Sequence, residues 1–280
     1  MSAKAVQFHY AARSDVGLVR SNNQDSGYAG ANLLVLADGM GGPAGGDIAS
    51  SVALAHLVPL DTDSHPADSM LPLLREALLD AHEELTDRSS RDRDLEGLGT
   101  TCIALMRSGN RLAMVHIGDS RAYVVGGGGI RQLTHDHSAL QEARDLAATS
   151  GAPRVIPPAN VVTKALGAGQ SGSVKADYTI MPLEEGDRAV ICTDGVHGVL
   201  QDAQIHAIVA AGDGPQGSAD ALVQASLETG TRDNTTAVVV YAGTESRGTL
   251  TTNVLNRMIQ PVRPASIETA RRVPRREGSN

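Results

Sequence analysis

Short aliphatic runs alternate with longer amphipathic stretches over the first 243 residues of the chain. Runs of β-branched and aliphatic residues predict strands at 32–37, 100–107, 111–117, 122–125, 130–133, 188–193 and 235–242. Apolar residues at helical spacing predict helices at 46–58, 68–88, 138–149, 202–211 and 217–227. The chain therefore mixes strands and helices in consecutive blocks.

The connections between these segments favour antiparallel sheets. Ser108, Gly109 and Asn110 form a hairpin-sized turn, and Gly126–Gly129 separates the next two strands. Consecutive hairpins are typical of antiparallel pairing, so the expected class is α+β, an α-β-β-α sandwich of two sheets with helices outside. The stretch 137–175, rich in Gly and Pro at its centre, is expected to be a flap-like surface insertion.

Composition narrows the range of functions. The chain has 41% hydrophobic residues, one Phe and no Trp, which predicts an aliphatic core. Its net charge is −8, but residues 245–280 carry seven Arg against three Glu, or +4, which leaves −12 for the rest. An acidic body argues against nucleic-acid binding. We therefore expect a domain over 1–243 and a basic, disordered tail over 244–280.

Two cysteines without a leader-like segment indicate a reducing, cytoplasmic setting, and no stretch is long and apolar enough for a membrane span. Cys102 and Cys192 each lie within an apolar, strand-like run. Both thiols are therefore expected in the core.

Aspartates recur where aliphatic runs end. Asp38, Asp119 and Asp194 follow such runs, and Asp233 precedes one. A single Asp-Gly pair signals only a turn, but four flanked strands predict a cluster if their ends converge. Such a cluster would repel itself unless a hard cation neutralised it, and oxygen ligands suit Mg²⁺ or Mn²⁺.

Eight motifs carry a specific resemblance. In chain order they are SDVGLVRSNNQD, LADGMGG, GTT, VHIGDSRAY, THDHS, TKALG, GDRAVICTDGVHG and DNTTAVVV. From about residue 11 to 243 the chain resembles the bacterial form of the PP2C (PPM) family of metal-dependent serine/threonine protein phosphatases. The resemblance implies a signalling hydrolase in which metal-activated water attacks the phosphoester without a covalent intermediate. It also implies phosphoprotein substrates, including Ser/Thr kinases.

The resemblance assigns roles by position. Asp38 would bridge two metals, with the Gly39 carbonyl on the second, and Asp194 and Asp233 would complete the first. Asp119 would help to hold a third, giving two or three Mn²⁺ or Mg²⁺ ions, and Arg20 would bind phosphate as a catalytic residue with Asp38. Residues expected to support the metals or to select the substrate from the flap are Gln24, Asp25, Asn234, Ser138 and Lys164.

Three departures from the family pattern leave questions open. Gln24 stands where a Glu is usual, Met40 follows Asp38-Gly39, and Lys164 replaces an Arg. A catalytically weak or silent regulatory binding module of the same fold is therefore the main alternative, and a small phosphoester is an alternative substrate. A dinucleotide fingerprint is formally present in Gly39-x-Gly41-x-x-Ala44, but the hairpins that follow disfavour it.

The histidines give weaker signals. His116 lies within a predicted strand and is interpreted as a core residue. His135 and His137 could suggest a metal pair, but no third ligand has suitable spacing. His197 follows Asp194-Gly195 and is interpreted as part of a surface turn.

Overall fold

A computed structural model describes residues 6–62, 65–126, 128–150, 156–169, 173–243 and 253–255. The strands are β1 Gln7–Asp15, β2 Asp25–Ala29, β3 Leu33–Met40, β4 Gly99–Thr100, β5 Cys102–Ser108, β6 Arg111–Ile117, β7 Arg121–Gly126, β8 Gly129–Gln132, β9 Leu166–Gly167, β10 Asp177–Pro182, β11 Arg188–Cys192, β12 Thr235–Gly243 and β13 Asn253–Leu255. The helices are α1 Gly42–Leu57, α2 Met70–Arg91, α3 Ala139–Ser150, α4 Asp194–His197, α5 Asp202–Ala211 and α6 Pro215–Thr229, with 3₁₀ turns at Val58–Thr62 and Arg93–Leu95.

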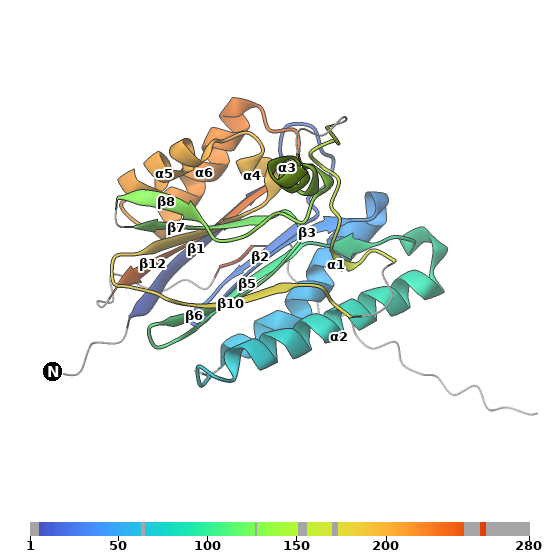
Figure 1. Ribbon diagram of the computed structural model, residues 1–280, viewed down its shortest axis with the longest axis horizontal. Coiled ribbons are helices and arrows are strands. Elements are labelled where there is room, and N and C mark those ends of the chain that lie inside the picture. The colour runs from blue at the N-terminus through green and yellow to red at the C-terminus, as the bar shows by residue number, and fades with distance from the viewer. Residues whose placement is uncertain are drawn as a thin grey trace, which may run out of the picture.

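The strands form two antiparallel sheets that face each other. One has the order β1-β12-β11-β7-β8, and the other runs β10-β6-β5-β3-β2-β13, with β4 joining β3 to β9. Helices α1 and α2 cover the outer face of the second sheet, and α5 and α6 cover the first (Figure 1). The predicted α-β-β-α sandwich is therefore confirmed.

The period-two alternation of the strands divides the core into three apolar layers. On β3, Leu33 and Val35 pack towards α1 and α2, whereas Leu34 and Leu36 pack between the sheets. On β12, Val239 packs against α5 and α6 in the same way. Because both faces of these strands are covered, they read as continuous aliphatic runs in the sequence.

Most predicted elements are present with small shifts in their ends. The predicted strand 100–107 is interrupted at Thr101, whose backbone N–H donates to the Asp38 carbonyl at 2.9 Å while its Oγ1 accepts from the Asp38 N–H at 3.0 Å. Strands β1, β2, β9, β10 and β13 were not predicted from the sequence pattern. Their segments mix polar residues, Gly or Pro with apolar ones, and pairing with neighbouring strands decides their conformation.

Two further predictions concern the flap and the tail. The flap begins with helix α3, as predicted, and it returns to the second sheet at β9 and β10. The predicted tail lies outside the described residues except for Asn253–Leu255, which pairs with Ala29–Gly27 as β13. Within the described ranges, no helix combines the length and apolar character needed to cross a membrane.

Candidate active site

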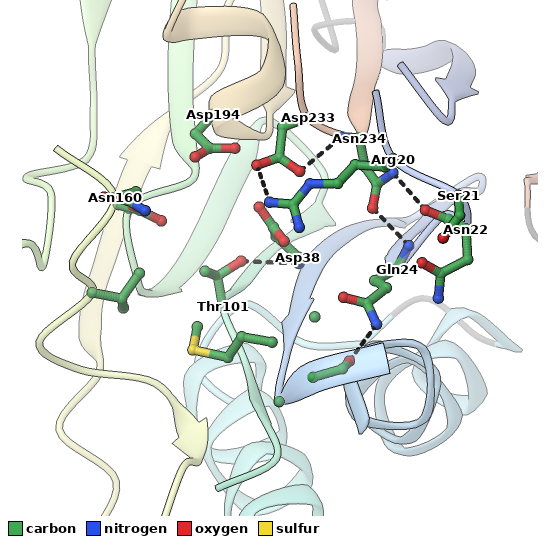
Figure 2. A pocket seen from close by; sticks show the side chains of 16 residues that line it. Arg20, Ser21, Asn22, Gln24, Asp38, Thr101, Asn160, Asp194, Asp233 and Asn234 are labelled. Atoms are coloured by element: carbon green, nitrogen blue, oxygen red, sulfur yellow. Dashed lines mark hydrogen bonds and ion pairs between the residues drawn. The ribbon is translucent and has the colours of Figure 1, made fainter. Parts of the chain in front are cut away.

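The four predicted strand-end aspartates line one open cleft of about 500 Å³. Asp38 comes from β3, Asp119 from the turn between β6 and β7, Asp194 from the first residue of α4, and Asp233 from the loop before β12. In Figure 2 the carboxylates of Asp38, Asp194 and Asp233 point towards one another around the guanidinium of Arg20. The convergence that the sequence predicted is therefore present.

A hydrogen-bond chain joins Asp38 to the turn that carries Asp119. The Asp38 carbonyl accepts from Thr101 N–H at 2.9 Å and from the Thr100 hydroxyl at 2.9 Å. The Thr101 hydroxyl, which accepts from Asp38 N–H, also pairs with the Ser120 hydroxyl at 2.9 Å. Two carboxylates more than 80 residues apart in sequence are thus held on a shared backbone frame.

Gly39 lies where β3 passes against α1. A Cβ added to Gly39 would lie 1.8 Å from the Gly46 carbonyl oxygen, and one added to Gly46 would lie 2.7 Å from the Gly39 carbonyl oxygen. Only glycine permits this approach of two backbones. Gly39 lines the cleft, as a carbonyl ligand would require.

Arg20 lies on the β1–β2 loop at the mouth of the cleft. Its Nη2 donates to Asp233 Oδ2 at 2.7 Å, and this hydrogen bond and ion pair raise the pKa of Arg20. Asn234 holds the loop: its amide nitrogen donates to the Val16 and Asn22 carbonyls, each at 2.9 Å, and its Oδ1 accepts from Gln24 N–H at 2.9 Å. Asn234 therefore fixes the loop that carries Arg20.

Gln24 and Asp25 occupy different places, although they are adjacent in sequence. The Gln24 side chain lines the cleft and its Nε2 donates to the Gly42 carbonyl at 2.8 Å. Asp25 is 1% exposed and pairs with Asp38 across β2 and β3. Its Oδ2 accepts from the hydroxyls of Thr193 at 3.0 Å and Thr236 at 2.7 Å, which the sequence analysis did not single out.

The carboxylates destabilise one another in their charged forms. Burial, reinforced by neighbouring aspartates, raises the pKa of Asp25 and of Asp119 to about 7 and that of Asp194 to about 6. The same causes raise the pKa of Asp38 well above its ordinary value. Each carboxylate would therefore be stabilised by a nearby positive charge.

The donor set fits a hard divalent cation. Four carboxylates in the cleft have Arg20 as their one cationic neighbour among the residues that line it, and Asp25 Oδ1 is buried without a hydrogen-bond partner in the described part of the chain. Oxygen-only ligation suits Mg²⁺ or Mn²⁺ and does not suit Zn²⁺. Asp38, Asp119, Asp194 and Asp233 line the cleft and could hold such ions.

Two predicted flap residues lie elsewhere. Ser138 is 3% exposed, and its hydroxyl accepts from Gln141 N–H at 3.2 Å in the first turn of α3, so it caps the helix and does not line the cleft. Lys164 does not line the cleft. The flap residues that do are Asn160 and Val162, and Figure 2 shows Asn160 on the side of the cleft opposite Arg20. The Pro-rich sequence around Asn160 and Val162 contains no motif that would have identified them as cleft residues.

The two-sheet sandwich and the four carboxylates in its cleft are features expected of a metal-dependent phosphatase. The sequence matches the family model of Protein phosphatase 2C over residues 19–228. This chain belongs to the protein phosphatase 2C family.

Three relatives illustrate the match. The chain is 38% identical over 240 residues to the serine/threonine protein phosphatase PstP of Mycobacterium tuberculosis, covering 85% of this chain and 46% of PstP. It is 30% identical to the protein phosphatase PhpP of Streptococcus pneumoniae over 83% of this chain and 96% of PhpP. The crystal structure of the PstP catalytic domain with two manganese ions superposes with a TM-score of 0.77 at 38% identity, covering 85% of this chain and 99% of that domain. The chain thus spans about half the length of PstP and nearly the whole of its catalytic domain.

Proposed function

We propose that this chain is a metal-dependent phosphatase that hydrolyses phosphoserine and phosphothreonine in proteins. The observation that carries the proposal is the convergence of Asp38, Asp119, Asp194 and Asp233 with Arg20 in one open cleft. The family and the manganese ions in the PstP catalytic domain support the same activity.

Different residues of the cleft would bind the metal ions and the phosphoryl group. Asp38 and the Gly39 carbonyl would hold two Mn²⁺ or Mg²⁺ ions, with Asp194 and Asp233 on the first, and Asp119 would serve a third. Bound, such ions supply positive charge that makes water a stronger nucleophile at neutral pH. The Arg20 guanidinium is half-exposed, so its planar fork can contact two phosphoryl oxygens at the cleft mouth.

The surroundings of the cleft suit a phosphorylated side chain on a larger molecule. The cleft opens to solvent between the Arg20 loop and the flap residues Asn160 and Val162. Phosphorylated proteins, Ser/Thr kinases among them, are the proposed substrates. Two buried, unpaired thiols, Cys102 and Cys192, support a reducing, cytoplasmic setting.

The test is hydrolysis of an aryl phosphate and of a phosphothreonine peptide with Mn²⁺, Mg²⁺ or EDTA. Wild-type protein and Asp80→Asn, an exposed change on α2, should turn over both substrates only with a metal. Asp38→Asn should lose turnover. Metal-independent hydrolysis, or an active Asp38→Asn protein, would refute the proposal.

The silent binding module is the second candidate. Gln24 favours it, because an amide at the edge of the cleft contributes no negative charge to metal binding. Manganese binding by calorimetry without turnover of either substrate would support the module. If Gln24 limits metal binding, Gln24→Glu should lower the Mn²⁺ concentration needed for half-maximal rate.

A further inference from the structure

Three histidines surround the turn that carries Asp119. The turn, Gly118–Ser120, connects β6 to β7. His116 lies on β6, His137 lies in the loop after β8, and His197 is the last residue of α4. His116 and His137 are 0% and 5% exposed and His197 is partly buried, so the interpretation of His197 as a surface turn was wrong.

His137 engages both polar backbone groups of Gly118. Its own N–H donates to the Gly118 carbonyl at 2.8 Å, and its ring Nδ1 accepts from Gly118 N–H at 3.1 Å. Because a backbone N–H can only donate, Nδ1 carries the lone pair and the ring proton sits on Nε2. That Nε2 lies 3.3 Å from Asp177 Oδ2 on β10, and the carboxylate oxygen accepts the hydrogen bond from it.

His116 and His197 hold the next two carbonyls. His116 Nε2 lies 3.1 Å from the Ser120 carbonyl oxygen, and His197 Nε2 lies 3.0 Å from the Asp119 carbonyl oxygen. Since carbonyls only accept, both rings are protonated on Nε2. Burial lowers the pKa of the His116 ring to about 4, so at neutral pH this ring has one proton and one lone pair.

The rings are also braced against each other and against the flap. The His116 and His137 rings stack with centroids 4.8 Å apart and planes inclined by 18°. The His137 carbonyl accepts from Thr163 N–H at 2.8 Å, which ties the base of the flap to the same turn. Gly118 itself has φ +110, and a Cβ there would lie 2.5 Å from the Thr101 side chain. The backbone of the turn therefore requires glycine at position 118, and hydrogen bonds from the three histidines hold it in place.

We propose that His116, His137 and His197 form a histidine clamp, a set of positioning residues that fixes the Gly118–Ser120 backbone and so holds the Asp119 carboxylate in the cleft. The physical need is clear, because Asp119 faces other carboxylates and a loose turn would let it swing away. Mutation of a group that orients a metal ligand typically lowers metal affinity or activity about 10- to 100-fold. The link to metal affinity rests on the proposed function; the link to the turn does not.

A metal site at the same cluster is the competing interpretation. His116, His137 and Asp177 offer ligand atoms that all lie within 4.8 Å of one another, and His116 Nδ1 is buried without a hydrogen-bond partner in the described chain. However, the Gly118 N–H places the His137 proton on Nε2, the nitrogen that faces Asp177. A metal bound to Nε2 would move the ring proton to Nδ1, and Nδ1 could then no longer accept the hydrogen bond from Gly118 N–H. The hydrogen-bonded clamp therefore accounts for more of the contacts.

The clamp predicts that Asn and Gln substitutions will have opposite effects at His137 and at the other two histidines. Asn places an oxygen near the Nδ1 position of a histidine, and Gln places an N–H donor near its Nε2. His137→Asn should therefore retain the acceptor for Gly118, and His137→Gln should lose it. At His116 and His197 the order reverses, because there the clamp atom is Nε2. Side-chain size alone would give the same order at all three positions.

Hydrogen exchange and Mn²⁺ affinity test the clamp. In metal-free protein, hydrogen exchange at the Gly118 amide should accelerate in His137→Gln and stay near the wild-type rate in His137→Asn. Calorimetric Mn²⁺ affinity should fall about 10- to 100-fold in the non-matching variants and recover most of that loss in the matching ones. Thermal melts accompany each variant, so that loss of folding is separated from loss of positioning.

A double-mutant cycle tests the route through Asp119. In an Asp119→Asn background the histidine variants should weaken Mn²⁺ binding no further. An equal additional loss, or the same Asn-versus-Gln order at His137 as at His116, would overturn the clamp. So would a Zn²⁺ ion that binds in saturating Mn²⁺ and is lost in Asp177→Asn. If wild-type protein hydrolyses no phosphoester, the proposed function fails, whereas exchange at Gly118 still decides the clamp.

Discussion

Replacement of Asp119 by Asn should stabilise the metal-free protein while weakening its metal binding. Asp119 is 7% exposed, and burial, with repulsion from Asp194, raises its pKa to about 7 against 3.8 as a free side chain. Because the folded pKa is raised, ionisation disfavours the fold: this cost is absent below pH 4 and complete above pH 7. Asn has nearly the same shape and cannot ionise.

The magnitude follows from the shift. About three pKa units at 1.36 kcal/mol each give about 4 kcal/mol at pH 8, and about 1.6 kcal/mol at pH 5. In EDTA, urea unfolding should therefore show the advantage of Asp119→Asn over wild type growing by about 2.5 kcal/mol between these pH values. With Mn²⁺ the order should reverse, since a metal stabilises the state that binds it.

Exposed Asp80 supplies the control: Asp80→Asn should track wild type at both pH values within about 0.5 kcal/mol. An Asp119→Asn protein that is no more stable than wild type at pH 8 in EDTA would refute the reasoning. A stability difference between Asp119→Asn and wild type that is as large at pH 5 as at pH 8 would also refute it. Either result would mean that burial and the neighbouring carboxylates do not disfavour the charged form of Asp119.

Three further changes test other parts of the site. Arg20→Ala should lower kcat/KM for a phosphothreonine peptide by about 10²–10³, as loss of a charge-stabilising donor does, measured at saturating Mn²⁺. Gly118→Ala should cost at least about 1–3 kcal/mol in urea unfolding, because its φ is +110 and a Cβ would meet Thr101 at 2.5 Å. Thr193→Val should cost about 1–3 kcal/mol in the same assay, because it removes the hydroxyl that donates to buried Asp25 and accepts from Thr236 N–H.

Each of these has a matched control. Arg13→Ala changes a half-exposed arginine on β1 and should leave kcat/KM near wild type. Gly109→Ala also changes a glycine with positive φ, +56, but in the described part of the chain no atom beyond its sequence neighbours would lie within 4 Å of the added Cβ, so it should cost less than Gly118→Ala. Thr229→Val alters an exposed hydroxyl at the end of α6 and should be nearly neutral. Equal effects in a test variant and its control would contradict the site-specific explanation.

Strands buried on both faces were predictable because burial imposes an aliphatic run. The segments of β3, β5, β6, β11 and β12 all showed this pattern, and the strand-end aspartates followed from it. By contrast β2, with the sequence Asp-Ser-Gly-Tyr-Ala, and β10, which ends at Pro182, lack a strand pattern. Their conformation depends on neighbouring strands, which a local pattern does not reveal.

The site divides in the same way. Motif order identified Arg20 and the aspartates, but it did not show that Ser138 caps a helix or that Asn160 and Val162 face the cleft. Those assignments depend on how the flap folds back over the sandwich.

The sequence by itself determined the alternation of apolar and polar positions, the antiparallel hairpins and the residues able to bind a divalent cation. It could do so because solvent exclusion and ligand chemistry act on residue types. Only the tertiary structure decided which side chains share a hydrogen bond. His116, His137 and His197 are separated by up to 81 residues, and their common contact with one turn arises from the packing of β6, the flap base and α4.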